Sequence, residues 1–168
     1  MIINMKDMAV KDRPVHLSES IDMTDFLSGR QDMTSSGEVK AEWTVSFTYP
    51  TVVVEGSLTV PVTLVCARCL GDVQEVLRIP VRERFTRETP GSDEEVAEDL
   101  HVVTEDLIDL KPYVEEAVWM SIPYIPLCSE SCKGLCPDCG TNRNEQECGC
   151  RQEKIDPRLA GLADFFKQ

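Results

Sequence analysis

The sequence has no apolar run as long as a membrane span, which needs about 20 residues. Its first residues, MIINMKDMAVKDR, also lack the hydrophobic stretch of a signal peptide, because Lys6 and Asp7 interrupt them. We therefore expect a cytoplasmic protein with no membrane partner. Structural disulfides are rare in the reducing cytosol, so clustered cysteines there usually bind metal.

Positive charge is scarce. The 30 acidic residues outnumber the 17 lysines and arginines, and the net charge is −13. This balance argues against a general nucleic-acid binder, because such a surface repels phosphates. The acidic run Asp93, Glu94, Glu95, Glu98 and Asp99 is a candidate contact for a basic partner, although most charge runs are only solvated. The region from 128 to 158 is nearly neutral, with five cations and six acidic residues.

Common catalytic motifs are also missing. The sequence contains no phosphate-cradling glycine-rich loop, no G-x-S-x-G and no HExxH. The two histidines, His16 and His101, are isolated, so we expect them to be exposed or hydrogen-bonded. We therefore expect neither an enzyme nor a protein with a small-molecule substrate.

Three segments alternate apolar and polar side chains in the pattern of half-buried strands. They run from Val39 to Tyr49, from Val52 to Leu64 and from Val73 to Phe85. In the second segment we expect a bulge at Gly56 and an edge position or an irregularity at Pro61. The stretch CARCLGD would form the turn between the last two strands, which gives an antiparallel meander.

Two helices are indicated by proline and aspartate. Asp109 is expected to cap a helix that runs to about Ile122, and a second helix is expected to start at Asp156. Residues 86–99 contain acid, proline and glycine and predict an exposed loop.

The predicted fold class is α+β: an antiparallel β meander with a few helices and a C-terminal cysteine-rich zinc-knuckle segment. At 168 residues the chain suits one folding unit. Within it we expect a sheet domain at 1–127, the cysteine-rich segment at 128–152 and a C-terminal helix at 153–168.

Six of the eight cysteines lie within 23 residues, in CSESCKGLCPDCGTNRNEQECGC. The last four, Cys136, Cys139, Cys148 and Cys150, have the spacing C-x2-C-x8-C-x-C. This spacing can bring four thiolates around a tetrahedral zinc ion at about 2.3 Å each. Asn142 and Asn144 suit the turn between the two pairs.

The other four cysteines are Cys66, Cys69, Cys128 and Cys132. A CxxC at a hairpin tip together with a C-x3-C predicts a second zinc site that would attach the cysteine-rich segment to the meander. Alternatively these cysteines are small buried hydrophobic residues, or Cys132 binds metal together with Cys136 and Cys139. A redox role is disfavoured because neither CxxC has a thioredoxin-like βαβ context.

Arginine side chains form a candidate contact surface for RNA or for another partner. Arg78, Arg82 and Arg84 share one face of the third strand, and Arg68 lies at the tip of the same hairpin. Such a stripe can bind RNA phosphates, although it is also what an ordinary solvated sheet face looks like.

The combination of C-x-R-C-L at a hairpin tip, a helix ending in IPLC, CKGLCPDCGTNRN, CGC and DPRLAGL resembles the bacterial YceD family of large ribosomal RNA subunit accumulation proteins. The resemblance spans Val39 to Leu162. One departure is Arg143, where the family usually has leucine between the two asparagines.

The resemblance implies a non-enzymatic cytoplasmic factor that large-subunit ribosomal RNA needs in order to accumulate. Its expected partner is ribosomal RNA or a basic ribosomal protein. Two alternatives are a zinc-ribbon nucleic-acid-binding module in transcription, which should be basic around its cysteines, and a thiol-disulfide oxidoreductase, which should hold no metal.

Overall fold

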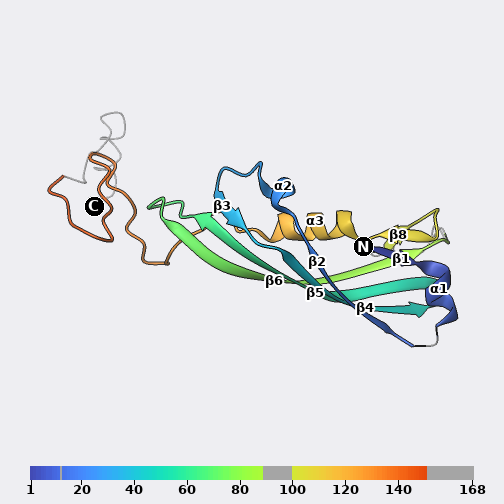
Figure 1. Cartoon of the computed structure of the whole chain (residues 1–168). Helices are drawn as coiled ribbons and strands as arrows, with labels where there is room; N and C mark the ends of the chain where they lie inside the picture. Colours follow the sequence, from blue (N-terminus) through green and yellow to red (C-terminus); the bar gives the residue numbers. More distant parts are fainter. Residues whose placement is uncertain (12, 89–99, 151–168) are drawn as a thin grey trace, which may run out of the picture.

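A long β-sheet forms the body of the protein in the computed structural model, which describes residues 1–11, 13–88 and 100–150 (Figure 1). The six-stranded sheet has the order β2-β4-β5-β6-β7, and β3 also pairs with β5. Its strands are β2 (Val15–Ile21), β3 (Met33–Ser36), β4 (Val39–Thr48), β5 (Thr51–Val65), β6 (Asp72–Thr86) and β7 (Leu100–Val102). The strands β1 (Ile2–Asn4) and β8 (Leu107–Asp109) form a separate antiparallel pair.

The predicted meander corresponds to β4, β5 and β6, which pair antiparallel in chain order. Together with the helices they confirm the α+β fold class. The sequence did not indicate β7, which lies beside β6 at the edge of the sheet and runs parallel to it.

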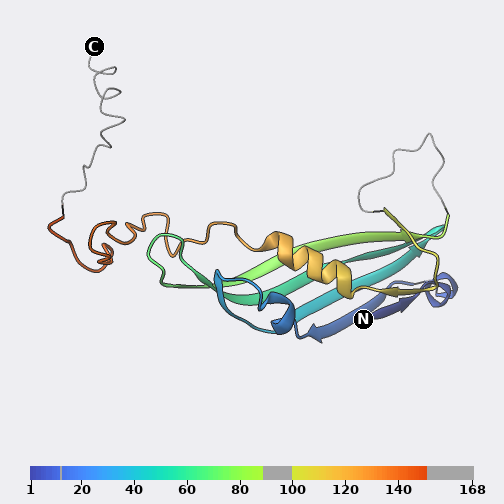
Figure 2. The ribbon, with the colours of Figure 1, turned by 90° about the horizontal axis from the view of Figure 1, so that it is seen from above.

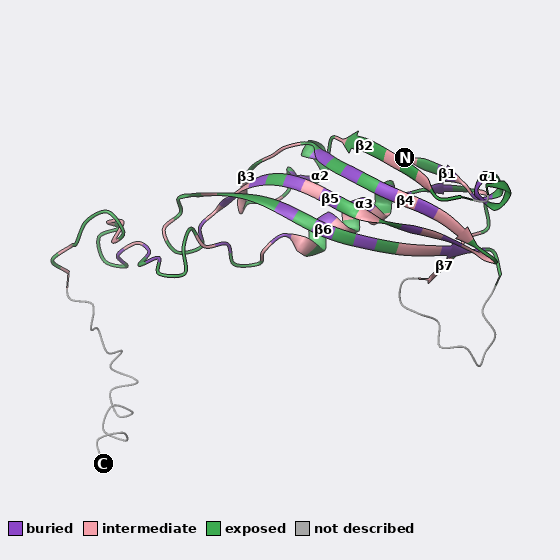
Figure 3. Ribbon diagram, turned by 90° about the horizontal axis from the view of Figure 1, so that it is seen from below, coloured by how far each residue is buried: buried purple, intermediate pink, exposed green. Residues whose placement is uncertain are grey.

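Alternation along the strands separates a buried face from an exposed one (Figure 3). On β5 the even-numbered residues from Val52 to Leu64, Gly56 excepted, are buried, and on β6 Leu77, Ile79, Val81 and Phe85 are buried. Each large apolar side chain removed from water contributes roughly 1.5–3 kcal/mol before the cost of ordering the chain.

Three helices accompany the sheet: α1 (Met5–Val10), α2 (Thr24–Leu27) and α3 (Lys111–Ser121). Helix α3 lies along β5 and β6 and buries Val114 and Val118, which are one turn apart on the same helix face (Figure 2). The Asp109 carboxylate accepts the Lys111 N–H at 3.0 Å. The helix predicted between Asp109 and Ile122 is confirmed, but its N-cap residue is Leu110 and not Asp109, which lies one position earlier.

The bulge expected at Gly56 is wrong. Gly56 pairs with Trp43 and with Val81, and the register continues unchanged on both sides. A Cβ atom added to Gly56 would lie 2.7 Å from Trp43 Cε3 and 2.0 Å from the Glu42 carbonyl oxygen. Glycine stands here because the Glu42 carbonyl and the indole ring of Trp43 occupy the space that a side chain would need.

The irregularity expected at Pro61 is confirmed, although β5 is a central strand. The pairing of β5 with β4 ends at Thr59, and its pairing with β3 begins at Val62. Pro61 lies between these two ladders, where its missing N–H interrupts neither, and its carbonyl accepts the Gly37 N–H at 2.9 Å.

The molecule is elongated, and the cysteine-rich segment lies beyond one end of the sheet (Figures 1 and 2). This is the end where β5 turns into β6, opposite to the end that carries α1. The expected C-terminal helix and most of the expected acidic loop fall on 151–168 and 89–99, outside the described residues. The expected loop began at Thr86, but Thr86 is a buried residue of β6.

The substitution Gly56→Ala should destabilise the protein by at least about 2 kcal/mol, because the added methyl group overpacks a site closed by backbone atoms. The matched control is Gly29→Ala, whose methyl group would meet nothing within 4 Å. Urea unfolding followed by circular dichroism measures both changes. Equal stability of the two variants would contradict the packing assigned to Trp43 and Gly56.

Candidate metal centre

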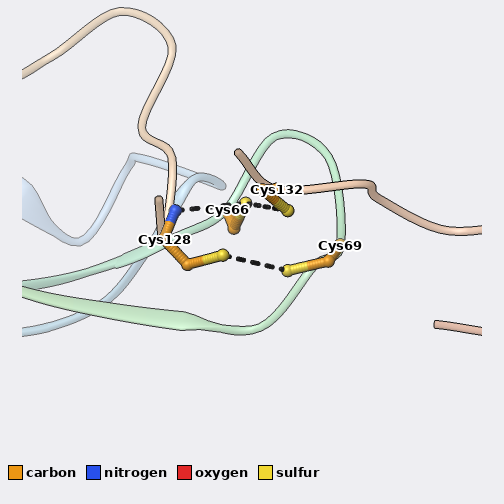
Figure 4. Close-up of side chains that lie close together, drawn as sticks. All are labelled: Cys66, Cys69, Cys128 and Cys132. Carbon is orange, nitrogen blue, oxygen red and sulfur yellow. Dashed lines mark hydrogen bonds between the residues drawn. The ribbon is translucent and has the colours of Figure 1, made fainter. Parts of the chain in front are cut away.

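The first group of four thiols joins the sheet to the cysteine-rich segment (Figure 4). Cys66 and Cys69 lie in the turn between β5 and β6, and Cys128 and Cys132 follow α3. Cys66 Sγ lies 3.9 Å from Cys132 Sγ, and Cys69 Sγ lies 3.6 Å from Cys128 Sγ. All four sulfur atoms lie within 4.8 Å of one another. We call this group the hairpin site.

Backbone hydrogen bonds hold the hairpin turn in the shape that the site needs. The Cys66 N–H donates to the Gly71 carbonyl at 2.8 Å, and the Leu70 N–H donates to the Cys66 carbonyl at 2.9 Å. The segment after α3 is attached here too, because the Ala67 N–H donates to the Pro126 carbonyl at 2.9 Å. The site therefore brings together residues that lie about 60 positions apart in the sequence.

The second group contains Cys136, Cys139, Cys148 and Cys150, whose sulfur atoms also lie within 4.8 Å of one another. We call it the terminal site. The turn after Cys139 is closed by the Gly140 N–H, which donates to the Cys136 carbonyl at 2.9 Å, and Gly140 has a φ of +73°. The structure thus forms the two groups of four that the spacing predicted, and Cys132 lies with the hairpin site.

The distances suit a tetrahedral metal ion. Four sulfur atoms at about 2.3 Å from a zinc ion lie about 3.8 Å from one another. The S–S separations of 3.6 and 3.9 Å in the hairpin site are close to that value. Both sites can hold a metal ion, and four thiolates would complete its coordination without leaving an open position.

The pKa values show how the thiols of the hairpin site compete for protons. Burial raises the pKa of Cys66, but the N–H groups of Cys128, Cys69 and Arg68 outweigh burial and lower that pKa to about 6. Hydrogen bonding to Cys132 raises the pKa of Cys128 most, and hydrogen bonding to Cys69 contributes next; that pKa reaches about 12.

In the terminal site, too, one thiol has a lowered pKa and another has a raised one. The hydrogen bond with the Thr141 hydroxyl lowers the pKa of Cys139 most, and the Thr141 N–H contributes next; together they bring it to about 6. Hydrogen bonding to Cys139 raises the pKa of Cys150 to about 12. Four adjacent thiols cannot all ionise unless a cation offsets their repulsion, and a metal ion supplies that cation.

Arg68 connects the hairpin turn to the segment that separates the two sites. One of its guanidinium nitrogens donates to the Cys132 carbonyl at 3.0 Å and to the Glu130 carbonyl at 3.1 Å. Its own carbonyl accepts the Leu135 N–H at 2.9 Å. The predicted contact residue Arg68 therefore supports the cysteine-rich segment.

The other predicted arginines lie on the exposed face of β6. Arg78 is exposed, Arg84 is half-buried, and Arg82 Nε lies 3.1 Å from Glu55 Oε1. The two side chains of that ion pair are 63% and 56% exposed, so the pair contributes little to stability. The three arginines share a sheet face, as expected, and RNA contact by them stays a prediction.

The histidines lie away from both cysteine sites. His16 Nδ1 lies 3.0 Å from Thr44 Oγ1, and His101 Nε2 lies 2.6 Å from Glu83 Oε2. Both are hydrogen-bonded, as expected.

Asn144 and Arg143 are contact residues whose roles sequence reasoning missed. Asn144 Nδ2 donates to Cys132 Sγ at 3.3 Å, and an Arg143 guanidinium nitrogen donates to the Lys133 carbonyl. In the sequence, the turn between Cys139 and Cys148 is a sufficient reason for its asparagines. Nothing in the sequence indicates that this turn contacts the hairpin site.

A groove of about 900 Å³ lies between the two sites. Arg68, Lys133 and Arg143 line it together with Glu147. Within the described part of the chain, Arg143 Nε is buried and has no hydrogen-bond partner. The exposed side chains of Arg68 and Lys133 give the groove positive charge that can attract an anionic group.

The fold and the two closed sites define an α+β sheet protein with two four-cysteine centres at one end. The family model "Large ribosomal RNA subunit accumulation protein YceD" matches residues 54–166. The chain belongs to the YceD family, which confirms the resemblance inferred from its motifs.

Several curated proteins are similar to this chain. An uncharacterised protein of Mycobacterium tuberculosis is 37% identical over 116 residues, which are 68% of this chain and 56% of the relative. The protein YlbN of Bacillus subtilis is 31% identical over 84% of this chain and 74% of its own length. The chloroplastic large ribosomal RNA subunit accumulation protein YCED homolog 1 of Arabidopsis thaliana is 31% identical over 61 residues, which are 36% of this chain and 19% of that protein.

The match to the mycobacterial relatives spans little more than half of their length. No solved structure was found to be similar to this chain. Within residues 1–11, 13–88 and 100–150, no helix is both long and apolar enough to cross a membrane.

Metal binding at both sites should strengthen as the pH rises, because each thiol gives up a proton when it binds the ion. Cys128 and Cys150, with pKa values of about 12, keep their protons at neutral pH. Cys66 and Cys139 have pKa values of about 6, so they keep their protons only below about pH 6. The metal affinity should therefore rise more steeply with pH below about pH 6 than above it. The slope of log affinity against pH should be larger there by about one proton per site.

Competition with a chromophoric chelator between about pH 5 and pH 9 measures this dependence. An affinity that does not change with pH would contradict binding through thiolates.

Proposed function

We propose that this protein is a non-enzymatic cytoplasmic factor that supports the accumulation of large-subunit ribosomal RNA and the assembly of the ribosome. The observation that carries the proposal is the family match over residues 54–166, which includes all eight cysteines. The matched residues include most of the β5–β6 hairpin, α3 and both cysteine sites.

The proposed metal is zinc, and its proposed role is structural. Four soft sulfur ligands in a tetrahedral arrangement favour zinc over magnesium or calcium, which prefer oxygen. Catalytic zinc normally keeps a position open for water or substrate, whereas four thiolates close the coordination sphere. This chemistry is the reason for proposing a factor that acts through binding.

The proposed partner is ribosomal RNA or a basic ribosomal protein. The net charge of −13 favours a basic protein, because long-range attraction speeds the encounter of opposite charges. Local cations favour RNA at two places: Arg78, Arg82 and Arg84 on β6, and the groove that contains Arg68 and Arg143. The exposed groove residues Arg68 and Lys133 can donate to a phosphate or a carboxylate.

Depletion of the protein in its native host should lower the ratio of large-subunit to small-subunit ribosomal RNA, because the proposed factor acts on one subunit. The unchanged gene should restore the ratio, and Cys136→Ser should not, since it removes a ligand of the terminal site. The control variant Gln146→Ala changes an exposed side chain of the same segment and should restore the ratio. Quantitative gel analysis of total RNA measures it, and an unchanged ratio after depletion would refute the proposal.

The substitution Arg78→Ala tests whether the β6 face contacts RNA. With a transcript of large-subunit ribosomal RNA as the probe, the loss of one phosphate contact should reduce the slope of log affinity against log salt by about 1. Lys11→Ala removes an exposed cation at the far end of the molecule and should leave the slope unchanged. If both variants keep the original slope, Arg78 on the β6 face does not contact RNA phosphate, and the groove that contains Arg68 and Arg143 is the remaining place proposed for RNA.

A further inference from the structure

One side chain of the terminal site's loop contacts a ligand of the hairpin site. Asn144 lies between Cys139 and Cys148, yet its Nδ2 atom donates to Cys132 Sγ at 3.3 Å. Its Oδ1 atom accepts the N–H of Lys133, the residue next to that cysteine, at 2.8 Å. The amide therefore acts on both the sulfur atom and the backbone of the hairpin site.

The position of Asn144 depends on the loop that the terminal site closes. Asn142 Oδ1 accepts the Asn144 N–H at 3.1 Å and the Asn144 Nδ2–H at 2.9 Å. Asn142 Nδ2 in turn donates to Glu145 Oε1 at 2.7 Å. The two ends of this loop are Cys139 and Cys148, so a metal ion bound to both restrains the loop at both ends.

The backbone between the sites provides a second link. The Arg143 N–H donates to the Gly134 carbonyl at 3.0 Å, and Leu135 forms a bridge with Asn142. Gly134 has a φ of +70°, and a Cβ atom there would lie 2.8 Å from the Arg68 carbonyl oxygen. The loop of the terminal site, the connecting segment and the hairpin turn are thus in direct contact.

We propose that the two sites bind metal cooperatively and that Asn144 is the positioning residue that couples them. Metal in the terminal site restrains the loop, which holds the Asn144 amide against Cys132 Sγ, and the N–H donor stabilises that sulfur as a thiolate ligand. Hydrogen bonds to metal ligands from such outer positions typically change metal affinity by 10–100-fold. Coupling between binding sites is reciprocal, so metal in the hairpin site strengthens binding at the terminal site by the same factor.

The inference rests on the proposed metal binding and is tested with zinc and the full chain. Cys139→Ser with Cys150→Ser disables the terminal site and yields the affinity of the hairpin site alone. Cys66→Ser with Cys128→Ser yields the affinity of the terminal site alone. The coupling factor is the product of the two affinities in the intact chain divided by the product of the two single-site affinities.

We expect a coupling factor of about ten or more in the unchanged protein and a several-fold smaller factor in Asn144→Ala, in which only the backbone link between the sites remains. Gln146→Ala, the matched control in the same loop, should keep the full factor, because its exposed side chain is not part of the network described above. Far-ultraviolet circular dichroism of each variant verifies that the sheet remains folded.

Asn144→Asp separates coupling from a merely structural role of the residue. Aspartate keeps an oxygen that can accept the Lys133 N–H but replaces the Nδ2 donor with a carboxylate oxygen beside Cys132 Sγ. The coupling factor should therefore fall at least as far as in Asn144→Ala. Recovery of the full factor with aspartate would overturn the assignment to the donor.

Native mass spectrometry provides an independent readout at half-saturation with zinc. Two identical independent sites leave about half of the molecules with one metal ion, and unequal sites leave more. Cooperative sites leave fewer than the two single-site affinities predict for independent binding, so depletion of the one-metal species below that fraction supports the inference. Uptake of two ions without this depletion overturns the coupling and leaves the proposed function standing, whereas the absence of zinc uptake overturns both.

Discussion

The continuous pairing of β5 with β6 is the constraint on which the rest of the structure depends. Every residue from Thr51 to Val65 pairs with a partner between Asp72 and Thr86. A ladder of this length needs a regular register. Gly56 permits it by avoiding a clash with β4, and Pro61 falls between the ladders of β5 with β4 and with β3, where its missing N–H interrupts neither. The ladder also fixes the place of Cys66 and Cys69, because its turn projects them beyond the covered part of the sheet.

The cysteine-rich segment lacks an apolar core of its own. Between residues 128 and 150 the buried positions are Cys132, Gly134 and Cys136. So little burial cannot offset the entropy lost when a segment of this length is ordered. The segment instead depends on the backbone contacts made by Arg68 and, in our proposal, on two metal ions. Metal binding and local folding would then be one process, as in other small metal-stabilised units.

Cooperative sites would give this end of the molecule two main states. In one, both ions are bound and the groove between the sites has its full set of lining residues, with Arg68 from the hairpin and Arg143 from the terminal loop. In the other, both sites are empty and four thiols in each compete for protons. A partner that recognises the groove would distinguish these states without contacting the metal.

Local patterns in the sequence were sufficient for the strands of the meander, for α3 and for the terminal group of four cysteines. Alternation with a period of two indicates which side of a strand is buried, and C-x2-C-x8-C-x-C places four donors within reach of one ion because the chain between them is short. The bulge expected at Gly56 failed because glycine serves there to admit Trp43 from the neighbouring strand, and that contact is formed only in the sheet.

The parallel strand β7, the contacts of Arg68 and the hydrogen bond from Asn144 to Cys132 were decided by tertiary structure alone. Each joins residues whose separation is set by the folded path of the chain, so no pattern of neighbouring residues encodes it. The sequence by itself indicated the terminal group of four thiols, whereas the structure decided that Cys132 lies with Cys66, Cys69 and Cys128. Only the tertiary structure decided that the two sites lie close enough for one to act on the other.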